Sequence, residues 1–152
     1  MWLCGKHVIG PDVEGVVAQV GATTVVCLTQ RHELADRYPE YVEWLDRESS
    51  TGVEGRAVWH PIHDLSVPAT EAFIELVTDL GTRVAAGEVL IVHCAAGLGR
   101  AGTVATGVLI DLGMEPADAL RHLAAHRPMA GPEVGAQSAL VAAFDEWHRR
   151  PQ

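Results

Sequence analysis

The sequence predicts an α/β fold with a central, mostly parallel sheet that is flanked by helices on both faces. Short apolar or β-branched runs alternate with longer amphipathic segments along the chain. The run at 22–29 is unbroken, which is typical of a strand buried on both faces of a parallel sheet, and the run at 89–94 is a short apolar strand. A glycine-rich turn then joins the second run to an apolar segment. We therefore expect the 89–94 strand to be central, with its carboxyl end at the functional crevice.

The first part of the chain shows clear start and stop signals. Asp12 is placed to cap a helix whose valines recur at helical spacing, and Gly21 ends that helix. Pro61 stops a later strand-like run. The expected elements are a strand at 2–4 within an irregular segment 1–9, a helix at 12–20, a strand at 22–29, a charged helix at 31–48, a loop at 49–55 and a strand at 56–62.

The second part is predicted to be mainly helical around the 89–94 strand. Phe73, Val77 and Leu80 lie on one stripe of a helix at 68–86. The segment 101–113 is apolar nearly all round, so we expect a buried helix there, directly after the glycine-rich turn. The two last expected helices lie at 116–126 and 133–148.

Composition limits the classes of function. A chain of 152 residues with 48% hydrophobic residues is the size of one domain, and we expect residues 1–152 to form it. The formal net charge of −9 repels polyanions, so nucleic acid and anionic membranes are not expected partners. An anionic substrate would need a local positive site.

We expect a cytoplasmic, monomeric protein that needs no cofactor or metal. No run reaches the roughly 18 apolar residues of a spanning helix, and no leader pattern opens the chain. Its three cysteines include no CxxC pair, which argues against a disulfide framework and a zinc site. Because alanine and arginine are abundant and lysine is rare, a bacterial origin is expected.

The turn "VHCAAGLGRAG" at 92–102 has the composition of an anion cradle. Backbone N–H groups of such a turn point inward, and the following helix contributes the positive end of its dipole. Gly97 and Gly99 permit backbone angles that larger residues resist, and Arg100 could bind two oxygens of a phosphate with its planar fork. The same groups would stabilise a thiolate at Cys94, which makes this cysteine a candidate nucleophile. Residues 94–100 are hereafter called the phosphate loop.

The phosphate loop resembles a known signature. "HCAAGLGRAG" is similar to the HCxxGxxR motif of the cysteine-based protein tyrosine phosphatase superfamily, and "HPIHDLSVP" resembles the P-x-x-D loop of dual-specificity phosphatases. "VVCLTQRHEL" resembles a strand and turn near the start of small dual-specificity and kinase-associated phosphatases. The segment 127–137 resembles their stretch that ends in a glutamine.

The resemblance implies a role for each matching residue. Cys94 would attack phosphorus, Asp64 would protonate the leaving oxygen and then deprotonate water, and His93 would support the loop. Gln137 would help to position the water, although a solvent-facing helix glutamine is an equal alternative. Asp64 could also be an ordinary turn residue beside a proline. The phosphate-binding residues would be Ala95, Ala96, Gly97, Leu98, Gly99 and Arg100.

One position departs from the family pattern. The residue after the arginine is usually serine or threonine, whose hydroxyl is thought to stabilise the departing sulfur, and here it is Ala101. Losing such a bond should slow the second step roughly 10- to 100-fold. The leading hypothesis is a phosphomonoester hydrolase with a phosphocysteine intermediate. The alternative is a phosphate-binding pseudophosphatase, and sulfur transfer is a remote third.

The substrate is predicted only by class. The short chain indicates a shallow cleft of the dual-specificity type, and Ala95, Ala96 and Leu98 stand where relatives acting on inositol phosphates commonly have lysine. A phosphorylated protein is therefore expected as substrate, with a small phosphomonoester as the other possibility. Cys4 and Cys27 are expected core residues, and a reversible disulfide from either to Cys94 is left open.

Overall fold

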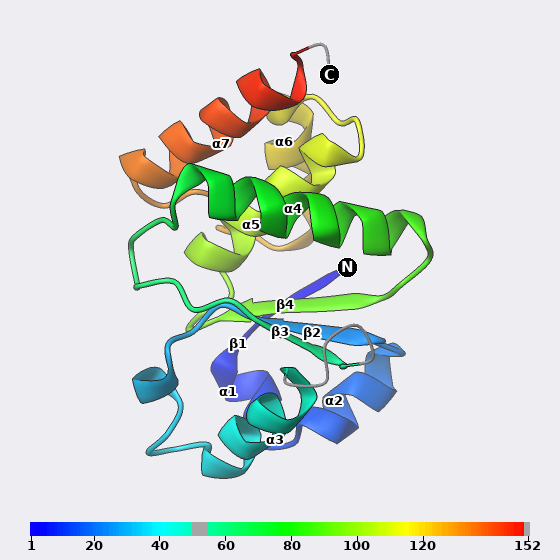
Figure 1. Ribbon diagram of the computed structural model, residues 1–152, viewed down its shortest axis with the longest axis vertical. Helices are drawn as coiled ribbons and strands as arrows, with labels where there is room; N and C mark the ends of the chain where they lie inside the picture. The colour runs from blue at the N-terminus through cyan, green and yellow to red at the C-terminus, as the bar shows by residue number, and fades with distance from the viewer. Residues whose placement is uncertain (50–54, 151–152) are drawn as a thin grey trace.

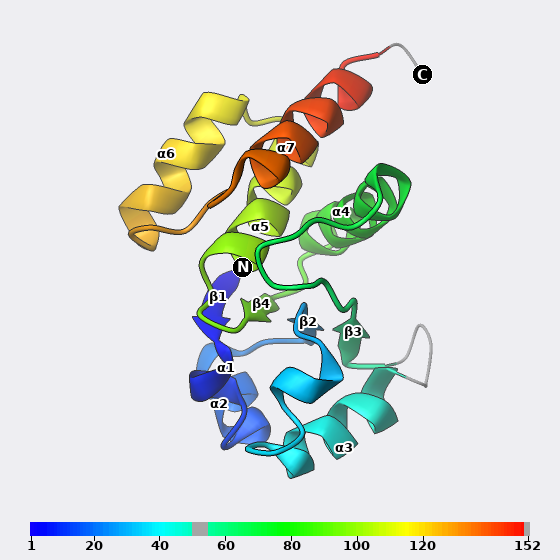
Figure 2. The same cartoon turned by 90° about the vertical axis from the view of Figure 1, so that its left-hand side faces the viewer.

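The protein has a parallel sheet between two layers of helices, as Figures 1 and 2 show. The computed structural model describes residues 1–49 and 55–150. The α/β prediction is confirmed, and every pairing in the described sheet is parallel, in the order β1-β4-β2-β3. The strands are β1 (Trp2–Gly5), β2 (Thr24–Cys27), β3 (Ala57–Trp59) and β4 (Leu90–Cys94).

Seven helices of the described chain cover the two faces of the sheet. In Figure 1, α1 to α3 lie below the sheet and α4 to α7 above it. Asp12 caps α2 by accepting a hydrogen bond from the amide of Gly15 at 2.9 Å, as its position predicts. The helices are α1 (Lys6–Ile9), α2 (Val13–Val20), α3 (Pro39–Ser49), α4 (Thr70–Ala85), α5 (Gly99–Asp111), α6 (Pro116–His126) and α7 (Gly135–His148).

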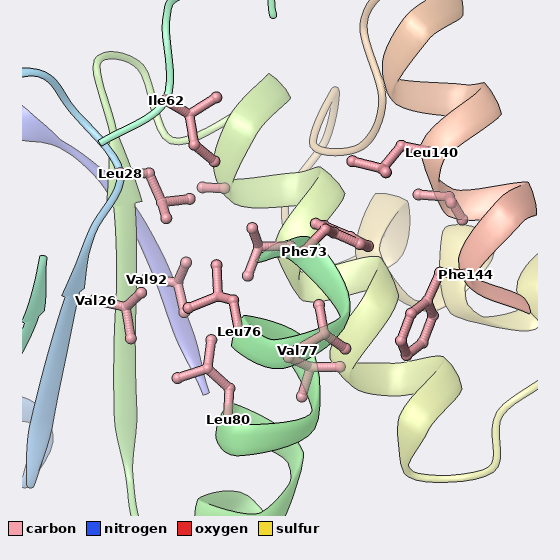
Figure 3. Packing of buried hydrophobic residues seen from close by; sticks show 14 of the residues in the cluster. Val26, Leu28, Ile62, Phe73, Leu76, Val77, Leu80, Val92, Leu140 and Phe144 are labelled. Atoms are coloured by element: carbon pink, nitrogen blue, oxygen red, sulfur yellow. The ribbon is translucent and has the colours of Figure 1, made fainter. Parts of the chain in front are cut away.

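A hydrophobic core lies on each side of the sheet. The larger one fills the space between the sheet and α4, α5 and α7. In it the rings of Phe73 and Phe144 pack edge to face, with their centres 5.8 Å apart (Figure 3). The other core lies between the sheet and α1 to α3. Successive residues of β4 point to opposite cores, so Val92 and Cys94 face the first and Ile91 the second. This burial on both faces explains the unbroken apolar run.

Three predicted boundaries were wrong. The charged stretch 31–48 is not one helix, because Pro39 opens α3 and disfavours helical geometry at the residue before it; a separate 3₁₀ turn forms at Arg31–Glu33. Residues 6–9 form the short α1 rather than an irregular segment. Helix α5 begins at Gly99, inside the phosphate loop, and not at residue 101. The predicted loop at 49–55 lies largely outside the described residues.

The sheet order positions the phosphate loop. Strand β4 lies between β1 and β2, with His93 opposite both Cys4 and Cys27. All strands are parallel, so their carboxyl ends share the edge at which β4 continues into the phosphate loop. Among the described residues, no helix is long and apolar enough to span a membrane.

Candidate active site

The phosphate loop is packed against the end of β1. Gly97 has a φ of 74°, and a Cβ atom at this position would also collide with the carbonyl group of Cys4. The amide of Lys6 donates a hydrogen bond of 3.1 Å to the carbonyl of Ala95. Glycine is therefore required at 97 both for its backbone angle and for the close approach of a neighbouring strand.

Arg100 is the buried cation of the site. Its side chain is 1% exposed, and its Nη1 donates to the carbonyl of Ile62 at 2.8 Å. Its Nη1 and Nη2 also bind the two carboxylate oxygens of Glu33, at 2.7 and 2.9 Å. Nε is buried and has no hydrogen-bond partner among the described residues. A buried N–H without a partner is rare and costly, so this atom is suited to receive an anion.

Glu33 is a site residue that the sequence reasoning missed. It lies in the 3₁₀ turn after β2, where its carboxylate also accepts a hydrogen bond from the backbone N–H of Gln30 at 2.9 Å. Burial opposes ionisation, but the hydrogen bonds from Arg100 and Gln30 prevail and lower the pKa of Glu33. The resemblance of "VVCLTQRHEL" to a strand and turn of small dual-specificity phosphatases implies no role for this glutamate.

Asp64 lies beside Arg100, on the loop between β3 and α4. Its Oδ1 is 3.2 Å from Nη2 of Arg100, and its side chain is 66% exposed. The next residue, Leu65, has a φ of 55° and is 59% exposed. Positive φ is uncommon for such a side chain, and strain of this kind clusters at functional loops. The structure thus brings Asp64 and Arg100 together, although 36 positions separate them in sequence.

His93 lies under the phosphate loop and is fully buried. Burial lowers its pKa to about 4, so the imidazole is neutral near pH 7. Its Nε2 is 2.6 Å from the hydroxyl of Tyr41 in α3, and its Nδ1 is 3.4 Å from the carbonyl of Cys94. A neutral ring satisfies both contacts if Nδ1 carries the proton and Tyr41 donates to Nε2. Helix α3 thereby supports the base of the loop.

Gln137 is buried, so the solvent-facing alternative for this residue is wrong. The residue lies in the first turn of α7 and is only 1% exposed. Its amide oxygen accepts from the backbone N–H of Glu133 at 2.8 Å, and its amide nitrogen donates to the carbonyl of Ser66 at 3.3 Å. Gln137 therefore ties the start of α7 to the loop that carries Asp64.

Comparison with known proteins identifies the family. The profile of the family described as "Swiss Army Knife protein, DSP-PTPase phosphatase domain" matches residues 9–141. The chain belongs to this DSP-PTPase family. No curated protein matches the sequence.

Solved structures share the fold of this DSP-PTPase domain. A crystal structure of Tk-PTP in the active form is 24% identical, with a TM-score of 0.68 over 95% of this chain and 88% of that one. Human DUSP28 is 19% identical, with a TM-score of 0.72 over 96% and 91%. Kinase associated phosphatase, crystallised with its catalytic cysteine changed to serine, is 20% identical, with a TM-score of 0.74 over 100% and 86%.

The cysteines of this DSP-PTPase domain are all free. Cys94 is 3% exposed at the end of β4, and Ala101, in the first turn of α5, is fully buried in the same core. Cys27 is a core residue, as predicted, but it faces the opposite core from Cys94. Burial raises the pKa of both Cys4 and Cys27 to about 11, so neither is a ready thiolate near neutral pH. Within the described ranges, no cluster of three metal-ligating side chains occurs.

Proposed function

We propose that the protein is a phosphomonoester hydrolase of the dual-specificity type that acts through a phosphocysteine intermediate. Cys94 attacks phosphorus in line with the leaving oxygen, while Arg100 and the loop amides from Ala95 onward bind the phosphoryl oxygens. Asp64 donates a proton to the leaving oxygen. In the second step Asp64 takes a proton from water, which attacks phosphorus and releases the sulfur of Cys94.

The observation that carries this proposal is the state of Arg100. Its guanidinium group is held on one edge by Glu33, and its buried Nε has no partner in the described chain. This donor lies at the start of α5, where the helix dipole is positive. The carboxyl group of Asp64 lies 3.2 Å from the same guanidinium and is the candidate proton donor for a leaving oxygen.

A second candidate function rests on Ala101. Because this position is fully buried and carries no hydroxyl, nothing there can donate a hydrogen bond to the departing sulfur. The alternative is therefore a phosphate-binding module. Such a module would bind an anion, or form the phosphocysteine once and hydrolyse it inefficiently. The placement of Asp64 favours the enzyme.

We propose a phosphorylated protein as the substrate class, with a small phosphomonoester as the other possibility. The loop positions Ala95, Ala96 and Leu98 add no charge beyond Arg100, and the chain as a whole carries −9. Both features disfavour substrates with several phosphate groups. Cytoplasmic location, a monomeric state and a bacterial origin remain predictions.

The deciding experiment follows product release from p-nitrophenyl phosphate during the first turnover. The parent protein is compared with Cys94→Ser and Asp64→Ala. A burst that Cys94→Ser abolishes supports the phosphocysteine route, and a slow phase after it points to intermediate hydrolysis as the limiting step. If release equals that of Cys94→Ser while vanadate still binds, the enzyme proposal is wrong and the binding module remains.

A further inference from the structure

An apolar cavity lies beside the edge strand β1, away from Asp64. It has a volume of about 540 Å³ and is lined by residues of β1, α4, α5 and α6 and of the turns after α5 and α6, among them Trp2, Leu109, Leu112 and Leu123. Trp2 and Leu112 are 54% and 45% exposed. The volume is that of a small-molecule site, and the exposed apolar side chains at its rim are unusual for a surface without a ligand.

Among the described residues that line the cavity, the formally charged side chain is a positive one, Arg127. His122 and His126 also line it, with their ring centres 4.3 Å apart, and no carboxylate lines it within residues 1–49 and 55–150. This is notable in a chain with a net charge of −9. The complementary ligand is a small molecule with an apolar body and one anionic group.

Arg127 also holds the phosphate loop. Its Nε donates to the carbonyl of Gly97 at 2.8 Å and its Nη2 to the carbonyl of Ala96 at 2.9 Å. A trans peptide group is planar, with its C=O and N–H pointing in opposite directions. Holding these two carbonyls outward therefore turns the amides of Gly97 and Leu98 toward the inside of the loop, where an anion would bind.

The guanidinium group of Arg127 uses one of its edges to bind the phosphate loop. Nε and Nη2 form the edge on the phosphate loop, while Nη1 lies on the other edge and makes no hydrogen bond among residues 1–49 and 55–150. An anion at Nη1 would restrain the side chain without competing for the loop carbonyls. Restraint of Arg127 would in turn favour the anion-binding arrangement of the loop.

We propose that this cavity binds a small apolar anion and that Arg127 couples its occupancy to the phosphate loop, so that each ligand tightens the binding of the other. The cavity site stands apart from the proposed phosphatase reaction, whereas the coupling rests on the phosphate loop's proposed role as an anion site. Its test therefore uses binding and not turnover.

The cavity is tested with octanoate as the anionic probe. Titration calorimetry compares octanoate with octanol, and with the variants Leu112→Glu at the rim and Leu120→Glu as the control. Leu120 is 39% exposed and does not line the cavity. We expect saturable octanoate binding that is at least about ten-fold tighter than octanol binding, is weakened by Leu112→Glu and is unchanged by Leu120→Glu. Equal binding of octanoate and octanol, or equal effects of the two variants, overturns the site.

The coupling is tested with orthovanadate as the phosphate-loop ligand. We expect the octanoate dissociation constant to fall at least about five-fold in saturating vanadate, and the vanadate constant to fall by the same factor in octanoate. The Arg127→Met variant should lose this mutual effect. Unchanged constants overturn the coupling. If vanadate binds and couples but p-nitrophenyl phosphate is not turned over, the phosphatase proposal fails and this one stands.

The other possible occupant of this face is a second copy of the chain, paired through the edge strand β1. Sedimentation velocity at rising protein concentration distinguishes the two. A monomer that binds octanoate supports the proposal. A dimer that Leu112→Glu dissociates, together with absence of octanoate binding, would show instead that the cavity is a self-association surface.

Discussion

Glu33 and Arg100 stand 67 positions apart in the chain, yet they form a two-pronged ion pair with distances of 2.7 and 2.9 Å. The pair fixes the plane of the guanidinium before any anion arrives. Burial opposes the charge of each partner, while their mutual hydrogen bonds lower the pKa of Glu33 and raise that of Arg100. Preorganised charges of this kind cost little reorganisation when a transition state forms.

Replacing Glu33 with glutamine should lower kcat/KM for p-nitrophenyl phosphate about 10- to 100-fold, because the neutral amide no longer holds the guanidinium plane through two charged bonds. Steady-state kinetics of Glu33→Gln measures the change. Glu40→Gln, an exposed glutamate in the first turn of α3, is the matched control and should resemble the parent. Equal activity of both variants would contradict the role given to Glu33.

Replacing Ala101 with serine should speed hydrolysis of the intermediate about 10- to 100-fold by supplying a hydroxyl for the departing sulfur. Rapid-mix kinetics should show the steady phase rising, while the amplitude of the first-turnover burst stays the same or falls because less intermediate accumulates. The site is fully buried, so serine, which adds one oxygen, is preferred to the larger threonine. A steady rate equal to the parent's would remove Ala101 as the cause of slow turnover.

Replacing Gly97 with alanine should abolish vanadate binding and lower the free energy of unfolding by more than about 2 kcal/mol, since both the φ of 74° and the Cys4 carbonyl oppose a Cβ atom. Gly87→Ala is the control, because Gly87 has a φ of 91° but no described residue lies within 4 Å of an added Cβ. That variant should show only the strain, about 1 kcal/mol, and normal vanadate binding. Similar losses in both variants would rule out the contact with Cys4 as the cause.

Acidification should destabilise the protein through His93. In the unfolded chain this histidine takes up a proton near pH 6.5, whereas in the folded protein burial lowers its pKa to about 4. The free energy of unfolding therefore has its full value above pH 6.5 and decreases as the pH falls toward 4, by up to about 3 kcal/mol. The lowered pKa of Glu33 adds a further loss below its usual value of 4.5.

Urea unfolding at pH 7.5 and pH 4.5 measures this dependence. We expect a smaller difference between the two conditions in His93→Gln than in the parent, whatever the overall stability of the variant. His32→Gln, an exposed control, should keep the parent's difference. If the free energy of unfolding of His93→Gln falls between pH 7.5 and pH 4.5 as much as that of the parent, a group other than His93 causes the pH dependence.

The predictable parts of the site are those encoded by neighbouring residues. Cys94, the glycines and Arg100 lie within one short turn, and a short apolar run predicts strand β4. Glu33 and Arg127 were missed because their contacts exist only once β2 and α6 are placed around the loop. Burial of Gln137 likewise depends on the docking of the loop at Ser66, which no local pattern records.

Contacts from both ends of the chain complete the phosphate loop: the amide of Lys6 binds Ala95, and the guanidinium of Arg127 binds Ala96 and Gly97. During synthesis, a chain that has left the ribosome only as far as residue 126 already contains the cysteine but lacks one support of its cradle. We expect the anion site to mature late, after α6 has emerged, so that prematurely ended products accumulate without binding phosphate.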